Sequence, residues 1–231
     1  MHKIKNLTFF QIFFLISSLI GLNINQCQAD IKQIPCHLRH PPCYNITASE
    51  EPKFIWFRVA KVGTRSILAI LRQYTTFSVS SYKVPFKAHE SKKYFKFAFV
   101  RNPWDRVVSC YCNQVLNGHG AAYRECFGKD FDFFVDFINK QDLTTADIHI
   151  RLQTVLIPLK DLDFLGRFER FAEDLRLVLD RLGFYEAKIL HHNRSTHTHY
   201  SHYYNERTRK IIAKKYKKDI ENFNYIFEDK R

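Results

Sequence analysis

Short apolar runs alternate along this chain with stretches in which apolar residues recur at helical spacing. Phe54–Val59 and Phe95–Val100 are nearly continuous apolar runs, a pattern typical of parallel strands that are covered on both faces. Leu162–Phe168 is a further strand candidate. Because strands alternate with helical segments, the pattern predicts a parallel sheet flanked by helices in a single α/β domain.

Several helical segments carry signals for where they start and stop. Asn102 is a favourable cap for the helix that follows it, and Pro103 suits the first turn, where no backbone N–H is needed. Asp130 caps a Phe-rich helix, and Gly183 is a favoured residue after a helix end. One predicted helix starts at Ser66, and the others cover Trp104–Leu116, Asp130–Asn139, Phe171–Leu182 and Glu206–Glu221.

The N-terminus has the composition of a targeting segment. Two lysines precede an apolar run from Leu7 to Ile24, and residues 27–29 form a small-x-small cleavage pattern. The run contains polar residues, so it is weak for a bilayer span of about 20 apolar residues. We predict that residues 1–29 direct export, either as a cleaved signal peptide or as a retained signal-anchor. Residues 30–52 are predicted to be an irregular stem, and residues 53–231 the folded domain.

The cysteines fit an exported chain. Cys36 and Cys43 flank a Pro-containing loop and are candidates for a disulfide in an oxidising compartment, with free thiols as the equal alternative. Cys110 and Cys112 are two residues apart on a predicted helix, which favours a core position over a metal site. Asn45-Ile46-Thr47 and Asn193-Arg194-Ser195 are glycosylation sequons that matter only in a eukaryotic secretory lumen.

The charge of the chain narrows the class of partner. Lys and Arg number 36 against 23 Asp and Glu, which gives a formal net charge of +13. Such an excess favours anionic partners, namely nucleic acid, nucleotides, acidic glycans or anionic membranes. Export argues against nucleic acid, and the chain carries no recognised nucleic-acid-binding motif.

The segment Val59–Ser66 is a candidate phosphate site between a predicted strand and a predicted helix. Gly63 lets the backbone approach a ligand closely. The N–H groups of the helix start, the Thr64 and Ser66 hydroxyls and the Lys61 charge together suit a phosphate. No Walker A sequence is present, and a strand-turn-helix with these residues is also an ordinary structural feature.

A second anion site is predicted where the run Phe95–Val100 stops. Arg101 directly follows this run and precedes a helix start, where its planar fork suits a bidentate phosphate contact. Ser109 adds a hydroxyl from the following helix. The alternative is that Arg101 pairs with Asp105 and that Ser109 is an ordinary small helix residue.

Taken together, the two segments resemble the sulfonate-donor motifs of the Golgi carbohydrate sulfotransferases, grouped as sulfotransferase family 2. Those enzymes use 3′-phosphoadenosine 5′-phosphosulfate (PAPS). Arg58–Ser66 resembles their 5′-phosphosulfate loop, with Ala60 where many members carry Pro, and Phe99–Tyr111 resembles their 3′-phosphate motif. Further similar segments are Gly166–Leu175, Asn193–Ser195, Tyr203-Tyr204 and Lys215–Tyr225, so the resemblance covers residues 54–227.

The resemblance implies a fold and a role for each motif residue. The expected fold is a P-loop-like central parallel sheet flanked by helices, and residues 53–231 are then the sulfotransferase domain. Lys61 is expected to stabilise charge on the bridging oxygen as the sulfonyl group leaves, with no metal required. Lys61, Gly63, Thr64, Arg65 and Ser66 are expected to hold the 5′-phosphosulfate, and Arg101 and Ser109 the 3′-phosphate.

A general base for the acceptor hydroxyl is predicted just before the central strand. We choose His89, because imidazole titrates near neutrality and relatives that sulfate glycan 2-hydroxyls use a histidine. Glu90 is the alternative base, and an exposed His89 without a role is the structural alternative.

Three other features have a functional and a structural interpretation. His149 and Gln153 share a face if their stretch is helical, and line the acceptor cleft or form a packed surface pair. The basic last helix attracts an acidic glycan or is simply solvated. A zinc site among the C-terminal histidines is disfavoured because no Cys pair accompanies them: His191, His192, His197, His199 and His202.

The sequence therefore predicts a PAPS-dependent enzyme that transfers a sulfonate group to a carbohydrate hydroxyl. The expected acceptor is an anionic glycan, and no nucleic acid partner is expected. A non-catalytic glycan-binding relative of the same fold, or less favourably a basic nucleic-acid-binding protein, is the alternative. Because the donor must be present, an exported enzyme of a eukaryote is predicted at the Golgi membrane with a lumenal domain; a secreted protein, or an exported protein of a bacterium, is the alternative.

Overall fold

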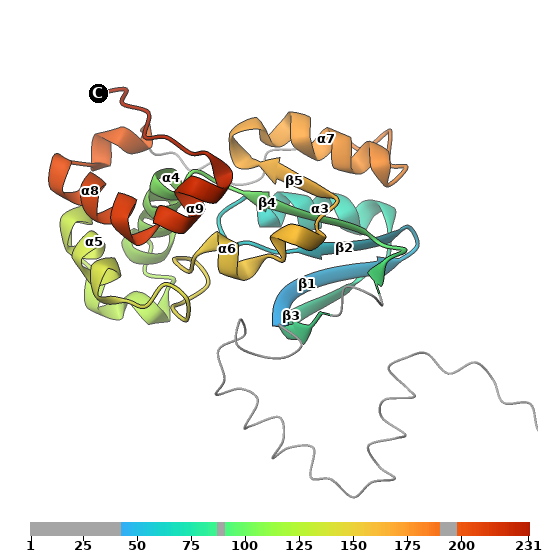
Figure 1. Ribbon diagram of the computed structural model, residues 1–231, viewed down its shortest axis with the longest axis horizontal. Helices are drawn as coiled ribbons and strands as arrows, with labels where there is room; N and C mark the ends of the chain where they lie inside the picture. Colours follow the sequence, from blue (N-terminus) through green and yellow to red (C-terminus); the bar gives the residue numbers. More distant parts are fainter. Residues whose placement is uncertain (1–42, 87–90, 190–197) are drawn as a thin grey trace, which may run out of the picture.

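One mixed sheet of five strands forms the centre of the protein in its computed structural model (Figure 1). The structure describes residues 43–86, 91–189 and 198–231, with the backbone alone for residues 43 and 78–85. The strands are β1 (Cys43–Glu50), β2 (Lys53–Phe57), β3 (Ser78–Pro85), β4 (Phe95–Val100) and β5 (Phe164–Arg167), in the order β3-β1-β2-β4-β5. Strands β2, β4 and β5 are parallel, whereas β1 is antiparallel to both of its neighbours.

The parallel strands form the core because their side chains are apolar on both faces of the sheet. Phe54, Trp56 and Phe57 of β2 and Phe97 and Phe99 of β4 are fully buried. Trp56 stacks on its register partner Phe97, with 6.0 Å between the ring centroids. Full burial of each phenylalanine contributes about 1.5–3 kcal/mol. The predicted strands are thus confirmed, and their packing fixes the carboxyl ends from which the candidate site is built.

The two strands at one edge of the sheet are not predicted by the sequence. Strand β1 lies inside residues 30–52, so the expectation of an irregular stem is wrong for the last part of that range. Polar residues interrupt both strands, CYNITASE and SVSSYKVP, so no continuous apolar run marks them. The sheet is therefore mixed rather than wholly parallel. Residues 1–29 and the start of the stem lie outside the described residues, and the predicted division of the chain stays a prediction.

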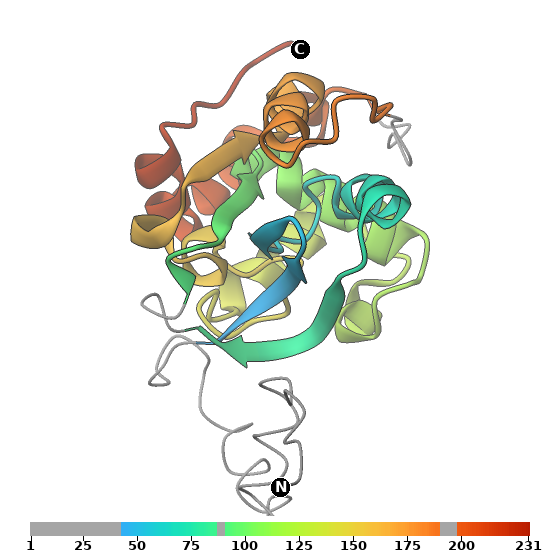
Figure 2. The same cartoon turned by 90° about the vertical axis from the view of Figure 1, so that its right-hand side faces the viewer.

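Helices cover both faces of the sheet, as an α/β fold requires. In Figure 2, α3 and α7 lie on one side of the strands and the C-terminal helices on the other. Ile67 and Leu71 of α3, and Leu175 and Leu179 of α7, are fully buried in the same cluster as the strands. The bounds are α3 (Thr64–Tyr74), α6 (Gln153–Leu156), α7 (Phe171–Arg181), α8 (Glu206–Lys215) and α9 (Lys217–Phe223).

A second apolar cluster packs beyond the carboxyl end of β4. It joins α4 (Pro103–Cys110), the π-helical turn η3 (Tyr111–Leu116), α5 (Phe131–Lys140) and α8. The predicted caps are confirmed: Asn102 accepts a hydrogen bond from the Trp104 N–H, and Asp130 accepts one from the Phe133 N–H. This cluster holds α4, and hence the start of the second motif, against the C-terminal helices.

The predicted helix Glu206–Glu221 is broken at Tyr216. Tyr216 has φ −102° and ψ 19° and separates α8 from α9. Its ring is fully buried, and its hydroxyl donates a 2.6 Å hydrogen bond to the carbonyl of Ile150. The periodicity is continuous across the break, so only this long-range contact reveals it.

Phe97→Ala is expected to lower the free energy of unfolding by about 3–5 kcal/mol, because it opens a cavity in a close-packed strand. Leu177→Ala on the exposed side of α7, where the side chain is 57% exposed, is the control and is expected to stay within about 0.5 kcal/mol of the parent. Urea unfolding followed by circular dichroism measures both, and equal effects would contradict the assignment of β4 to the core.

Candidate functional site

The loop between β2 and α3, residues 58–63, has an unusual backbone. Lys61 has φ 73° and Gly63 has φ 81°, both in the left-handed region. At Gly63 a side chain is also excluded by space, because a Cβ there would lie 2.5 Å from the ring of Phe171. The loop therefore has one backbone conformation, and Gly63 is the residue at which it enters α3.

The N-terminus of α3 is open to an anion. Gly63 is its N-cap without a side-chain hydrogen bond, and the first turn has no acidic residue. The backbone N–H groups of the first turn and the helix dipole favour a negative ligand there. The hydroxyl of Thr64 donates a 2.8 Å hydrogen bond to the carbonyl of Val59, so its proton braces the loop. Ser66 is buried, and Arg65 is exposed beside it.

Lys61 is a partly buried cation in this loop. Burial lowers its pKa to about 8, and the positive charges of Arg101, Arg65 and Arg106 act in the same direction. The structure shows no carboxylate of a described residue within ion-pair distance of Lys61. Positive charge thus gathers at the carboxyl end of β2, and among the described residues no carboxylate pairs with Lys61 itself. An anionic ligand is the partner that such a site favours.

Arg101 joins the loop to the end of β4. Its Nε atom donates a 2.8 Å hydrogen bond to Asp105, which is the pairing that the sequence left open as an alternative. Its Nη1 atom donates to the carbonyl of Lys61 at 3.0 Å, and the guanidinium lies 4.1 Å from the centre of the Phe168 ring. The two predicted anion motifs are therefore in direct contact through this side chain.

Gln153 fixes the backbone of Arg101. Its side-chain amide accepts a 2.9 Å hydrogen bond from the Arg101 N–H and donates a 2.8 Å one to the Arg101 carbonyl. Asp219 of α9 in turn accepts from the N–H groups of Gln153 and Thr154. Burial raises the pKa of Asp219. Gln153 is thus a buried clamp, and His149 does not share a helix face with it, because α6 begins only at Gln153.

Arg106 is a site residue that the sequence reasoning missed. It is fully buried on α4, and its guanidinium donates hydrogen bonds to the carbonyls of Ala60 at 3.1 Å, Arg151 at 2.8 Å and Ile148 at 2.8 Å. These bonds tie the β2–α3 loop to the segment before α6. The sequence signal for this role is that Arg106 falls on the buried face of the helix that follows Arg101.

Of the other residues that the sequence singles out, some are buried in the structure and others lie outside its described part. Ser109 is buried on α4, and the structure gives its hydroxyl no hydrogen bond to another described side chain. Cys110 is fully buried, as expected for one cysteine of its pair. The predicted bases His89 and Glu90, the segment Asn193–Ser195, and most of the C-terminal histidines lie outside the described residues.

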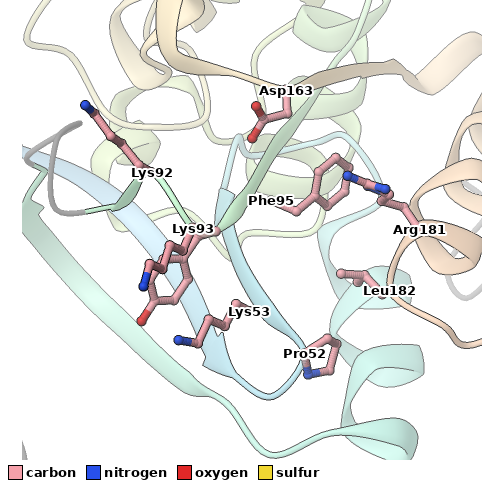
Figure 3. A pocket seen from close by; sticks show the side chains of 9 residues that line it. Pro52, Lys53, Lys92, Lys93, Phe95, Asp163, Arg181 and Leu182 are labelled. Carbon is pink, nitrogen blue, oxygen red and sulfur yellow. The ribbon is translucent and has the colours of Figure 1, made fainter.

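A basic hollow of about 500 Å³ lies at the other end of the parallel strands (Figure 3). Lys53 at the start of β2 and Phe95 at the start of β4 line it, whereas the β2–α3 loop follows the carboxyl end of β2. Asp163, its one carboxylate, already pairs with Lys96 at 2.8 Å. The hollow is therefore separate from the candidate site. Its other lining residues are Pro52, Lys92, Lys93, Tyr94, Arg181 and Leu182.

Within residues 43–86, 91–189 and 198–231, no group of three His, Cys, Asp or Glu side chains is arranged to hold a metal ion. In the same ranges, no helix has the length and apolar character that a bilayer crossing needs.

Comparisons with known proteins agree with the two motifs. The profile of the sulfotransferase family matches residues 44–226. Carbohydrate sulfotransferase 14 of Danio rerio is 28% identical over 116 residues, which is 41% of this chain and 32% of that protein. Carbohydrate sulfotransferase 11 of Rattus norvegicus is 33% identical over 51 residues, covering 22% of this chain and 14% of that protein.

The matches extend to an archaeal protein. An uncharacterised protein of Archaeoglobus fulgidus is 30% identical over 95 residues, which is 39% of this chain and 68% of that protein. The chain thus aligns with about a third or less of the length of the two named relatives. No solved structure gives a significant match.

Lys61→Met is expected to raise the free energy of unfolding near neutral pH, because it removes a charge that burial and neighbouring arginines disfavour. Between a folded pKa of about 8 and the ordinary value of 10.5, the unfolded chain binds more protons than the folded one. The stability of the parent therefore rises with pH in this window, and the advantage of the variant shrinks. Urea unfolding over this pH range measures the difference.

Lys214→Met on the exposed face of α8 is the matched control, with no pH-dependent advantage expected. A Lys61→Met advantage that is absent near neutrality, or that grows towards alkaline pH, would contradict the desolvated environment of Lys61.

Proposed function

We propose that this chain, which belongs to the sulfotransferase family, transfers a sulfonate group from PAPS to a hydroxyl of a carbohydrate. The observation that carries the proposal is the contact between the two motifs, in which Arg101 donates to the carbonyl of Lys61 at 3.0 Å. One arginine thereby sets the distance between the open start of α3 and the carboxyl end of β4. A nucleotide with two separate anionic groups is the ligand that fits two such sites.

In this proposal each end of the donor has its own set of contacts. The backbone N–H groups at the start of α3 and the charge of Lys61 support binding of the 5′-phosphosulfate. Among the described residues no hydrogen bond occupies Nη2 of Arg101, which supports a contact with a 3′-phosphate, and Ser109 lies near the end of α4. The proposed 5′-phosphosulfate residues are Lys61, Gly63, Thr64, Arg65 and Ser66, and the proposed 3′-phosphate residues are Arg101 and Ser109.

The chemistry of the proposed transfer is an in-line displacement at sulfur. The acceptor oxygen forms a bond to sulfur as the bond from sulfur to the bridging oxygen breaks, and negative charge moves onto the leaving phosphate. A cation and backbone N–H groups aimed at that oxygen lower the barrier. Lys61, with a pKa of about 8, is charged near neutral pH and supplies this charge. The proposal uses no metal ion.

The acceptor half of the proposal rests on composition and on the named relatives. Both of those relatives carry the name carbohydrate sulfotransferase. The net charge of +13 favours an anionic glycan. His89 is our proposed base and Glu90 the alternative, and Phe86, three residues before His89, packs against Phe57 at the end of β2.

The proposed location is the Golgi membrane, with residues 1–29 as signal peptide or signal-anchor and the folded domain in the lumen. A secreted protein, or an exported protein if the source is bacterial, is the alternative. The reason is chemical: an exported enzyme of this kind needs PAPS in the compartment where it acts.

The proposal is tested with labelled PAPS and a panel of glycosaminoglycans and other glycans, together with calorimetric binding of adenosine 3′,5′-bisphosphate to the full chain. Transfer to at least one glycan and binding of the bisphosphate are expected. A chain that binds no bisphosphate would contradict the whole proposal, whereas binding without transfer to any acceptor would favour the non-catalytic alternative.

Ser109→Ala is expected to weaken binding of adenosine 3′,5′-bisphosphate about tenfold or more, the effect of losing one hydrogen bond to a charged group. Binding of adenosine 5′-phosphate, which lacks the 3′-phosphate, is expected to stay unchanged and serves as the control ligand. An equal loss for both ligands would remove Ser109 from the 3′-phosphate site.

His89→Ala is expected to abolish sulfonate transfer while the dissociation constant of the bisphosphate stays within about twofold of the parent, since a base acts on the acceptor and not on the donor. Glu90→Gln measured beside it separates the two proposed bases. Full activity of His89→Ala would exclude His89.

A further inference from the structure

His149 and Asp147 form an oriented pair in the segment before α6. The Nδ1 atom of His149 lies 2.7 Å from Oδ1 of Asp147, and the His149 N–H donates to the same oxygen at 3.1 Å. Both side chains are partly exposed, His149 at 27% and Asp147 at 32%. In neutral His149, a proton on Nδ1 that faces the carboxylate leaves Nε2 with a free lone pair.

A third residue keeps the carboxylate in place. The hydroxyl of the fully buried Tyr123 donates a 2.6 Å hydrogen bond to Oδ1 of Asp147. Burial acts to raise the pKa of Asp147, but the hydrogen bonds from His149 and Tyr123 outweigh it and hold that pKa well below its usual range. Asp147 is thus ionised near neutral pH, and the orientation of the imidazole is anchored in the core.

The pair lies next to the β2–α3 loop. The guanidinium of Arg106 donates from Nε to the carbonyl of Ala60 and from Nη2 to the carbonyl of Ile148. Ala60 directly precedes Lys61, and Ile148 directly precedes His149. The guanidinium of Arg106 therefore fixes the spacing between the backbone next to Lys61 and the backbone next to His149.

Cys110 lies in the same neighbourhood. Its fully buried thiol is close enough to Tyr123 and Lys61 for both to act on its pKa, which burial raises to about 12. Because Tyr123 holds Asp147, the core around the oriented pair also adjoins Lys61.

We propose that His149, oriented by Asp147, binds the acceptor, with Nε2 accepting a hydrogen bond from a hydroxyl of the acceptor sugar beside the donor. This inference rests on the proposed function and adds a binding residue on the acceptor side. His89 remains the proposed base, and His149 positions the sugar. A sugar hydroxyl suits this atom, because it is a neutral donor that needs an acceptor of fixed direction.

The test measures binding of desulfated glycosaminoglycan hexasaccharides to the full chain saturated with adenosine 3′,5′-bisphosphate. His149→Ala is expected to weaken oligosaccharide binding about tenfold, the effect of one well-aligned hydrogen bond, with bisphosphate binding unchanged. His149→Gln keeps a side-chain atom that accepts a hydrogen bond, so it is expected to retain more oligosaccharide binding than His149→Ala. Asp147→Asn is expected to weaken binding less than His149→Ala.

His119→Ala is the matched control, because His119 is an exposed histidine in the loop after η3. Equal oligosaccharide binding by His149→Ala and the parent would overturn the inference, as would a parallel loss of bisphosphate binding, which would indicate a structural role. If the parent binds the bisphosphate but none of the hexasaccharides, the inference fails while the donor site stands. If the parent binds neither, both the inference and the proposed function fail.

Discussion

A single buried guanidinium determines how the parts of the candidate site are held relative to one another. Arg106 is fully buried and donates to the backbone carbonyls of Ala60, Ile148 and Arg151. Carbonyl dipoles satisfy its donors but do not neutralise its charge. If any of these carbonyls moved away, a buried donor would be left unsatisfied at a cost of about 1–3 kcal/mol. The β2–α3 loop and the segment before α6 are therefore constrained to one spacing.

The same constraint makes the site electropositive before any ligand arrives. Arg106 and Arg101 both lower the pKa of Lys61, and burial lowers it further. Asp105 offsets part of this charge through its 2.8 Å contact with Arg101. A folded protein that keeps cations close together loses stability relative to one that pairs them, and an anion bound at the start of α3 recovers part of that loss. The unfavourable charge arrangement and the preference of this site for an anion are consequences of one geometry.

Local sequence signals are sufficient to predict the strands that are buried on both faces and the residues that cap the helices. The apolar runs of β2 and β4 and the caps Asn102 and Asp130 need only neighbouring residues to be recognised, and the structure confirms them. Strands β1 and β3, by contrast, are defined by antiparallel pairing with other strands, and no apolar run in their composition marks them. For the site, the two motifs were recognised, but the clamp by Gln153 was not, because its partners are 52 and 66 residues away in the chain.

The segment before α6, the proposed acceptor side of the site, is held in place by the C-terminal helices. Tyr216, at the break between α8 and α9, donates to the carbonyl of Ile150, and Asp219 of α9 caps the start of α6. The segment with Asp147 and His149 is thus held from the C-terminal side, whereas the β2–α3 loop is held by the parallel strands. The two halves meet at Arg106, which joins the carbonyls of Ala60 and Ile148, and at the clamp by Gln153 on Arg101. Under the proposed function, substitutions in the segment with Asp147 and His149 can change which sugar is bound while the parallel strands keep the β2–α3 loop in its shape.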